Sequence, residues 1–110
     1  MIAMSYPYQI KSAAQYQDAY KKSKEDPEGF WREQAKRLEW VEFPTRIKNV
    51  DFNDEVRIRW FEDGVLNVSV NCIDRHLATR GDQTAILWEG DDPSFDKKIT
   101  YRELHRQVCK

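Results

Sequence analysis

Glycine is scarce in this chain of 110 residues, and the four glycines are isolated from one another. They are Gly29, Gly64, Gly81 and Gly90. A loop that wraps the phosphates of a nucleotide needs closely spaced glycines, and no stretch rich in Ser, Thr and Gly occurs. We therefore expect that these residues do not activate ATP alone. We assign no catalytic, cofactor-binding or metal-binding residue.

Cysteine and long apolar runs are also lacking. Two cysteines, Cys72 and Cys109, are too few to cross-link a domain of this size. The N-terminus shows no basic region followed by an apolar stretch, so no secretory signal is visible. No apolar run reaches the length of a membrane span. We expect a reduced, cytoplasmic protein with no membrane partner.

An excess of charge of one sign is absent as well. Lys and Arg number 18 and Asp and Glu number 19, which gives a net charge of −1. This balance does not fit a nucleic-acid partner, which would select a basic surface. The apolar fraction of 40%, with 13% aromatic residues, is enough for a modest core. At this length we expect one folded domain.

The first half of the chain carries helix signals. Residues 1–11 have no period and are expected to form an irregular arm. Ser12 is a suitable N-cap, and Asp26 followed by proline marks a second helix start. We therefore predict two short helices within residues 12–39. The second is expected to bury one stripe, formed by Trp31, Ala35 and Leu38.

The middle of the chain mixes extended and helical patterns. Residues 46–50 and 56–60 read as extended, and Glu62–Gly64 reads as a turn of the hairpin-forming type. A helical stripe follows, capped by Asn67 and ended by Arg80–Gly81. The stripe consists of Leu66, Val70, Ile73 and Leu77.

The last third parses as strand, acidic turn, short strand and helix. Residues 85–88 are apolar, and the run stops at the turn signal Gly90–Pro93. Residues 98–100 resume the extended pattern. Thr100 and Glu103 then have the spacing of a capping box that opens a helix.

Two side-chain patterns could carry metal or nucleophile chemistry. Cys72 with His76, and His105 with Cys109, each lie four residues apart on a predicted helix, and four such ligands could complete a zinc site. Both pairs flank stripes that core packing already explains, and cysteine is commonly a small buried hydrophobe. A cysteine nucleophile would need an activating base, for which a histidine four residues away is poorly placed. We favour the structural interpretation.

Carboxylates and aromatic residues recur. General acid–base chemistry would require a buried carboxylate, but the candidates lie beside Gly or Pro, as solvated turn residues do. These candidates are Glu62, Asp63, Asp82, Asp91 and Asp92. The aromatic side chains have mostly amphipathic spacing, which favours core packing, with an interface to a larger body as the alternative. They are Phe30, Trp31, Trp40, Phe43, Trp60 and Phe61.

Several ordered blocks resemble the AMP-forming acyl-CoA ligases, and acetyl-coenzyme A synthetases in particular. The blocks lie within Asp26–Trp40, Trp60–Asn67, Asn71–Leu77 and Trp88–Pro93. The first opens Asp-Pro-Glu-x-Phe-Trp, the third contains Asp-Arg-His-Leu, and the last reads Trp-Glu-Gly-Asp-Asp-Pro. The resemblance covers about residues 12–110. Propionyl-CoA synthetases are close relatives.

The resemblance implies an activity for the parent protein. Members of the family join acetate and ATP-Mg to give acetyl-adenylate and diphosphate, after which coenzyme A displaces AMP. Their phosphate loop and catalytic lysine lie downstream of this segment, so we carry over no functional residue. ATP, Mg and coenzyme A are thus implied for the full-length enzyme only. We expect the 110 residues alone to be inactive and structural, with the remainder of the ligase as their partner.

The expected fold class is an α+β fragment. Residues 12–80 would form the amino-terminal helical and extended region, and residues 81–110 would begin the truncated AMP-binding domain of the adenylate-forming fold. A detached sheet edge and an exposed final helix predict poor stability or self-association when the chain is made alone. The alternatives are a stand-alone interaction module and, far behind, a small zinc protein.

Overall fold

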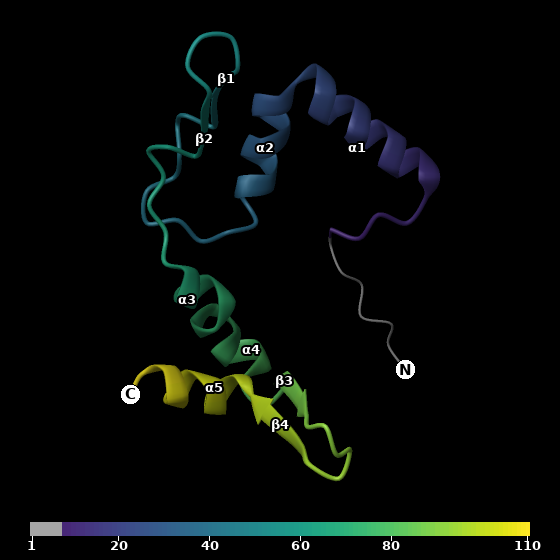
Figure 1. Cartoon of the computed structure of the whole chain (residues 1–110), viewed down its shortest axis with the longest axis vertical. Helices are drawn as coiled ribbons and strands as arrows, with labels where there is room; N and C mark the ends of the chain where they lie inside the picture. The colour runs from purple at the N-terminus through teal and green to yellow at the C-terminus, as the bar shows by residue number, and fades with distance from the viewer. Residues whose placement is uncertain (1–7) are drawn as a thin grey trace. The chain divides into compact units, whose positions relative to one another are not determined.

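The computed structural model describes residues 8–110, which divide into two compact units (Figure 1). The first unit comprises the described residues up to Arg37 together with Pro44–Asp63. The second comprises Leu38–Phe43 and Gly64–Lys110. The domain bounds expected from the sequence, 12–80 and 81–110, stay predictions. Residues 8–11 of the expected irregular arm form neither helix nor strand, and the rest of that arm lies outside the described residues.

Two helices open the first unit, as predicted. Helix α1 spans Ala13–Glu25 and helix α2 spans Pro27–Ala35. Ser12 Oγ accepts a hydrogen bond of 3.2 Å from Gln15 N at the start of α1. Asp26 both ends α1 and caps α2, where its Oδ1 accepts a bond of 3.0 Å from Gly29 N. In both caps, the side-chain oxygen accepts a hydrogen bond from the backbone N–H three residues later, which has no partner inside the helix.

The end of α2 differs from the prediction. The helix stops at Ala35, so Leu38 lies outside it and is 45% exposed. Only Ala35 of the expected stripe is buried, while Trp31 remains 41% exposed. Leu38 is lost from the stripe because the helix ends three residues before it.

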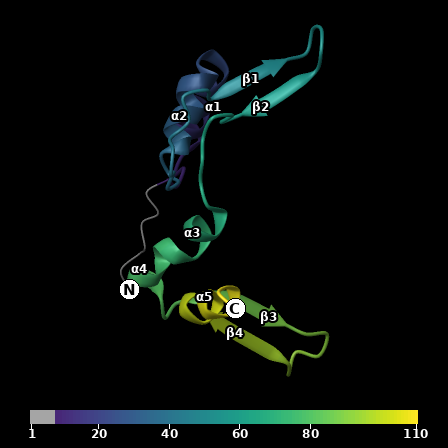
Figure 2. The same cartoon turned by 90° about the vertical axis from the view of Figure 1, so that its left-hand side faces the viewer.

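A β-hairpin completes the first unit, and both extended segments are confirmed. Strand β1, Lys48–Asp51, pairs antiparallel with strand β2, Arg57–Trp60 (Figure 2). The hairpin loop consists of residues 52–56. The predicted hairpin-type turn at Glu62–Gly64 is a turn, but it follows β2 and leads the chain out of this hairpin.

The core of the first unit is small. Its buried apolar residues are Ala35 at 3% exposure, Ile47 at 1% and Pro44 below 2%. So few buried side chains release little apolar surface from water, which leaves the unit with a modest hydrophobic stabilisation.

The second unit begins with a broken helix instead of the single one predicted. Helix α3, Val68–Cys72, is followed by a 3₁₀ turn at Asp74–His76 and by helix α4, Leu77–Arg80. The break occurs at Ile73, whose φ of −126° is not helical. β-Branched residues at four of these positions lower the helix propensity of this stretch. They are Val68, Val70, Ile73 and Thr79.

Both ends of this helical stretch lie where they were predicted, but the C-terminal end does not use the predicted mechanism. Asn67 caps α3, with its Oδ1 accepting a bond of 3.1 Å from Val70 N. Gly81 follows α4 with φ of −52°, so it is not the left-handed glycine that commonly ends helices. A Cβ at this position would lie 2.6 Å from Leu77 O, which makes close packing the reason that glycine fits here.

A second hairpin and a final helix complete this unit. Strand β3, Thr84–Glu89, pairs antiparallel with β4, Asp96–Thr100, and helix α5 spans Tyr101–Val108. A register irregularity lies between Thr84 and Ile86. The predicted order of strand, acidic turn, strand and helix is thus confirmed.

The segment Leu38–Phe43 joins the second unit through backbone and side-chain bonds. Glu42 pairs with Val65 in an isolated antiparallel bridge. Asn71 Oδ1 accepts a bond of 2.7 Å from Glu39 N, and Asn71 Nδ2 donates one of 2.8 Å to Glu39 O. Asn71 is 8% exposed and is the buried polar side chain among the described residues.

Among residues 8–110, no helix combines the length and apolar character needed to cross a bilayer.

Replacing Asn71 by leucine should destabilise the second unit. The substitution removes both partners of the Glu39 backbone from a part-buried position, which costs about 1–3 kcal/mol. Urea unfolding followed by circular dichroism measures the change. Asn53→Leu, in the exposed loop between β1 and β2, is the matched control and should have a much smaller effect. Equal losses in the two variants would contradict the role given to Asn71.

Candidate functional site

Four aromatic side chains form a cluster in the first unit, called here the aromatic cluster: Phe30, Trp31, Trp60 and Phe61. The rings of Trp31 in helix α2 and Trp60 in strand β2 meet edge to face with centroids 5.8 Å apart, although the two residues are 29 positions apart in the sequence. Phe30 and Phe61 lie beside them, at 5.3 Å from Trp31 and 6.2 Å from Trp60. Such edge-to-face pairs stabilise beyond the area that they bury. The cluster joins α2 to the hairpin.

The aromatic cluster is packed on one side and open on the other. Trp31, Trp60 and Phe61 line an open hollow of about 370 Å³. Trp60 is 39% exposed, so the rings contact one another but are not buried as a core would be. Its lining offers no ionisable group, and it is therefore suited to an apolar side chain, not to acid–base chemistry.

Phe61 has the single positive φ among the described residues other than glycine, at 52°. A bulky residue in this region is strained by about 1–3 kcal/mol and persists where surrounding contacts determine it. Two backbone bonds do so here: Phe61 N donates to Ile47 O at 2.9 Å, and Glu62 N donates to Arg46 O at 3.2 Å. The turn directs the chain from β2 toward the acidic pair that follows.

Asp63 anchors this turn. Its Oδ1 accepts bonds from Arg46 N at 2.9 Å and from Thr45 N at 3.0 Å, and Oδ2 accepts from the Thr45 hydroxyl. The Thr45 hydroxyl, followed by the Arg46 amide, lowers the pKa of Asp63 from 3.8 to about 2. Hydrogen bonds to the charged form stabilise it, so this carboxylate is a structural acceptor.

Glu62 has a similar structural role. Its carboxylate accepts a bond of 2.8 Å from Arg59 Nη1 and one of 3.2 Å from Asn49 Nδ2. The Arg59 bond, with that of Asn49, holds the pKa of Glu62 below its usual value. A general acid would need the opposite shift, so neither carboxylate of this predicted pair is poised for proton donation.

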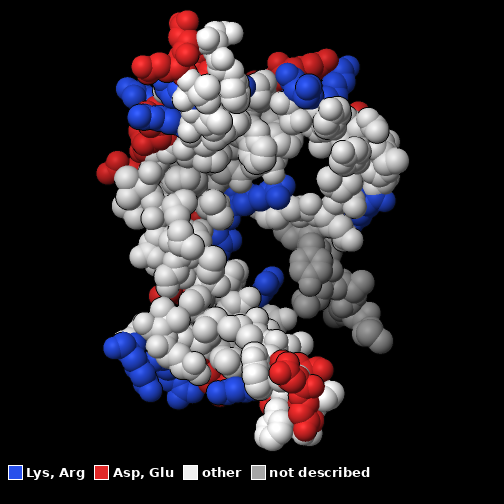
Figure 3. All heavy atoms as spheres, in the orientation of Figure 1, with Lys and Arg blue, Asp and Glu red and all other residues white. Residues whose placement is uncertain are grey.

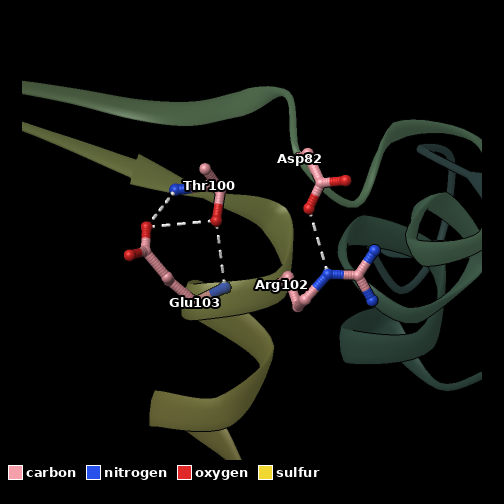
Figure 4. Close-up of polar contacts among 4 residues, drawn as sticks. All are labelled: Asp82, Thr100, Arg102 and Glu103. Atoms are coloured by element: carbon pink, nitrogen blue, oxygen red, sulfur yellow. Dashed lines mark hydrogen bonds and ion pairs between the residues drawn. The ribbon is translucent and has the colours of Figure 1, made fainter.

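In the second unit, the start of α5 is closed by its own chain (Figure 4). Thr100 Oγ1 accepts from Glu103 N at 3.2 Å, while Glu103 Oε2 accepts from Thr100 N at 2.9 Å, which confirms the predicted capping box. Tyr101 N donates to Gln83 O, and Arg102 N donates to Gly81 O. The N–H groups at Tyr101, Arg102 and Glu103 are thus already used and do not form an open anion cradle.

The other predicted carboxylates lie in exposed turns or ion pairs. Asp82 Oδ1 pairs with Arg102 Nε at 3.1 Å, with the Asp82 side chain 90% exposed. Asp92 Oδ1 accepts a bond of 2.9 Å from Ser94 N, which lowers the pKa of Asp92, and Asp91 is exposed beside it. On the face drawn in Figure 3, neither sign of charge forms one continuous patch.

The residues considered for zinc come together only in part. Cys109 Sγ lies 3.4 Å from His105 Nε2, and the same nitrogen lies 3.5 Å from Asp74 Oδ1. His76 instead contacts Tyr101 with its ring tilted and the ring centroids 5.2 Å apart, and Cys72 is exposed. Across residues 8–110, no three or more of the His, Cys, Asp and Glu side chains are arranged to hold a metal ion.

The side chains of Cys109 and His105 are in contact, although a histidine four residues away was predicted to be poorly placed for this. In a catalytic relay, the histidine takes the thiol proton through one ring nitrogen and is held by a third group through the other. Here the Cys109 thiol and the Asp74 carboxylate both contact Nε2 of His105, so this relay is not formed. The thiol is also exposed. This arrangement gives no support to a cysteine nucleophile.

Two features were missed at the level of sequence. Asn71 bonds a residue 32 positions away, and no local pattern marks such a partner. Phe61 adopts a backbone conformation typical of glycine; the residues Glu62–Gly64 that follow predicted a turn nearby, but not this conformation. The six predicted aromatic residues also divide: Trp40 and Phe43 contact each other in the second unit, at 6.0 Å, while the other four form the aromatic cluster.

The described residues thus combine hydrogen-bonded turns and helix caps with exposed aromatic and apolar surface. Residues 16–72, just over half of the chain, match the family described as acetyl-coenzyme A synthetase N-terminus. The chain belongs to this family. The match includes both helices of the first unit, its hairpin and α3, apart from the first residues of α1.

Individual relatives bear the same name. The chain is 62% identical over 98 residues to acetyl-coenzyme A synthetase of Bradyrhizobium sp. (strain ORS 278), covering 88% of this chain and 15% of the relative. It is 59% identical over 100 residues to that of Beijerinckia indica, covering 90% and 16%. It is 58% identical over 97 residues to that of Brucella anthropi, covering 88% and 15%. The chain thus spans about 15% of the length of the curated relatives it matches.

Acid should weaken the turn that Asp63 anchors. Because the folded pKa of about 2 lies below the ordinary 3.8, the stabilisation is complete above pH 3.8 and is lost as the pH falls toward 2. Carboxyl NMR titration should give a midpoint near 2 for Asp63, and Asp63→Asn should remove this part of the acid dependence. Asp91→Asn, in the exposed turn, is the control. A midpoint for Asp63 near 3.8 would contradict the assignment.

Proposed function

We propose that this chain is the amino-terminal segment of an AMP-forming acetate–CoA ligase. The family match over residues 16–72, together with relatives named acetyl-coenzyme A synthetase, carries this proposal. The parent converts acetate, ATP and coenzyme A to acetyl-CoA, AMP and diphosphate through an acetyl-adenylate. ATP, Mg and coenzyme A bind to the parent outside this segment, and the reaction takes place in the cytoplasm.

The role of the segment within the parent is structural. Its side chains with lowered pKa values accept hydrogen bonds that hold turns and a helix start, as in Asp63, Glu62 and Glu103. Its described residues bury few apolar side chains, namely Ala35, Pro44, Ile47 and Ile73, while many large apolar side chains remain accessible. Surface of this kind supports an interface with a larger body. The remainder of the ligase is the partner.

The second unit contributes the start of the adenylation domain. Strands β3 and β4 carry the pattern expected where residues 81–110 enter the adenylate-forming fold, and α5 follows them through its capping box. The boundary near residue 80 stays a prediction. The N–H groups at the start of α5 are used internally, which agrees with a phosphate site elsewhere in the parent.

A stand-alone interaction module is the second candidate. The hollow lined by Trp31, Trp60 and Phe61 favours it, because an open apolar depression bounded by aromatic rings can receive a partner's side chain. The two candidates differ in whether the reading frame continues past Lys110 into a Thr/Ser/Gly-rich loop. They also differ in whether the product of that frame is a ligase.

Acetate-dependent exchange of diphosphate into ATP tests the activity. The parent polypeptide should catalyse this exchange, and the 110-residue chain alone should not, because acetyl-adenylate formation requires the phosphate loop outside this segment. Propionate in place of acetate tests the close alternative of a propionyl-CoA synthetase. A full-length product that lacks exchange with either acid would overturn the proposed function.

The isolated chain should self-associate. Leu87 is 73% exposed on a two-stranded sheet whose edges are unpaired within the described residues, and such surface favours intermolecular contact. Sedimentation velocity over a concentration series should show growth in size, which Leu87→Lys should reduce. Thr79→Lys, which adds the same charge at an exposed position of α4, is the matched control. A wild-type chain that stays monomeric and unfolds cooperatively would contradict this expectation.

A further inference from the structure

We infer that Cys109 and His105 form a peripheral binding site for a thiophilic divalent cation of the Zn²⁺ type, with the carboxylate of Asp74 beside it. The inference is independent of the proposed function, because it rests on three side chains and on no property of the ligase reaction. The protein supplies two ligands and solvent completes the coordination. The site therefore differs from the four-ligand zinc site considered from the sequence.

The end of helix α5 places the two ligands on one face. Cys109 follows the last residue of α5, and its backbone N still donates to His105 O at 3.0 Å, so the helical geometry extends to the cysteine. Residues four apart on a helix are neighbours on its surface. Accordingly, Cys109 Sγ lies 3.4 Å from His105 Nε2.

This separation fits two ligands of one tetrahedral ion. Zinc bonds of about 2.3 Å to sulfur and about 2.0–2.1 Å to nitrogen, at the tetrahedral angle, place the two ligand atoms about 3.6 Å apart. The observed distance of 3.4 Å needs only a small opening of the pair. Thiolate and neutral imidazole are ligands that Zn²⁺ prefers, and the thiol proton passes to solvent when the cation binds.

The charge around the pair favours a cation. Asp74 Oδ1 lies 3.5 Å from His105 Nε2, and both side chains are partly exposed. A carboxylate at this distance attracts a divalent cation held by the same nitrogen. The neighbouring Arg75 bonds Asn71 Oδ1 through its Nη1. Cys109 is exposed, so the cation reaches the thiol from solvent.

The basic side chains of α5 are engaged away from the pair. Arg102 Nε pairs with Asp82 Oδ1 at 3.1 Å. Arg106 and Lys110 line a separate hollow of about 310 Å³ together with Glu103 and Gln107. The face that carries His105 and Cys109 is therefore not the face on which these basic residues gather.

The other pair with the same spacing shows why residue type alone is not enough. Cys72 ends α3 and His76 lies in the 3₁₀ turn, with the break at Ile73 between them. The break takes the two side chains off a common helical face, and the His76 ring contacts Tyr101 instead. Cys72 and His76 thus provide an internal control for the proposed site.

Titration with Co²⁺, a spectroscopic substitute for Zn²⁺, tests the site in the full-length polypeptide that carries residues 1–110. Under nitrogen, Co²⁺ should produce a thiolate-to-cobalt charge-transfer band in the near ultraviolet, and Zn²⁺ should displace it. Cys109→Ser should remove one equivalent of this band, whereas Cys72→Ser, the matched control, should leave it unchanged. An identical band in Cys109→Ser and the wild type, or equal losses in both variants, would overturn the inference.

The histidine and the carboxylate are tested separately. His105→Ala should weaken Co²⁺ binding at least about 10-fold, because even a partner outside the ligand set commonly contributes that much. His76→Ala should leave the affinity unchanged. Asp74→Asn keeps the shape of its side chain and removes the charge, and it should weaken binding several-fold. Circular dichroism checks that each variant is folded, and unchanged affinity in folded His105→Ala or Asp74→Asn would overturn the inference.

Two further results define the ligand set and the independence of the proposals. Mg²⁺ prefers oxygen ligands, so an excess of Mg²⁺ should leave the cobalt band in place. Displacement by Mg²⁺ as readily as by Zn²⁺ would assign the binding to carboxylates and overturn the inference. A polypeptide that lacks acetate-dependent exchange but shows the Cys109-dependent band would lose the proposed function and keep this inference; the reverse result would do the opposite.

Discussion

Asn71 fixes the segment Leu38–Phe43 against helix α3 of the second unit through a side chain that is almost wholly inaccessible to water. Its amide accepts from Glu39 N and donates to Glu39 O, and it also bonds Asn67 O and Arg75. A buried amide is costly unless it is satisfied, so these bonds specify one position for the segment before Pro44. In the first unit, the Asp63 carboxylate accepts backbone hydrogen bonds that join the turn after β2 to the chain before β1.

Such polar contacts matter here because the apolar core is small. Among the described residues, the buried apolar side chains are Ala35, Pro44 and Ile47 in the first unit and Ile73 in the second. Meanwhile β3 and the aromatic cluster expose side chains that a complete protein normally covers. A segment with well-specified turns and caps but little core of its own is suited to packing against a larger body. This physical argument and the family match lead to the same proposal.

Local features were predictable from sequence, and long-range ones were not. Ser12, Asp26 and Thr100 each cap a helix by bonding a residue three positions on, so a short window contains both partners. The left-handed Phe61 depends on backbone bonds to Ile47 and Arg46, which a short window does not contain. No functional residue was predicted for the segment, and the carboxylates considered for chemistry lie in turns, ion pairs and hydrogen-bonded anchors.

The sequence by itself determined the caps, the strands, the final helix and the family resemblance, because each depends on neighbouring residues or on ordered blocks along the chain. Only the tertiary structure decided the division into two units, the meeting of Trp31 with Trp60, and the burial of Asn71 against Glu39. These features join residues far apart in sequence, where packing and hydrogen-bond satisfaction override local preference. The meeting of Cys109, His105 and Asp74 required both: residue types and spacing from the sequence, and the approach of the 3₁₀ turn to α5 from the fold.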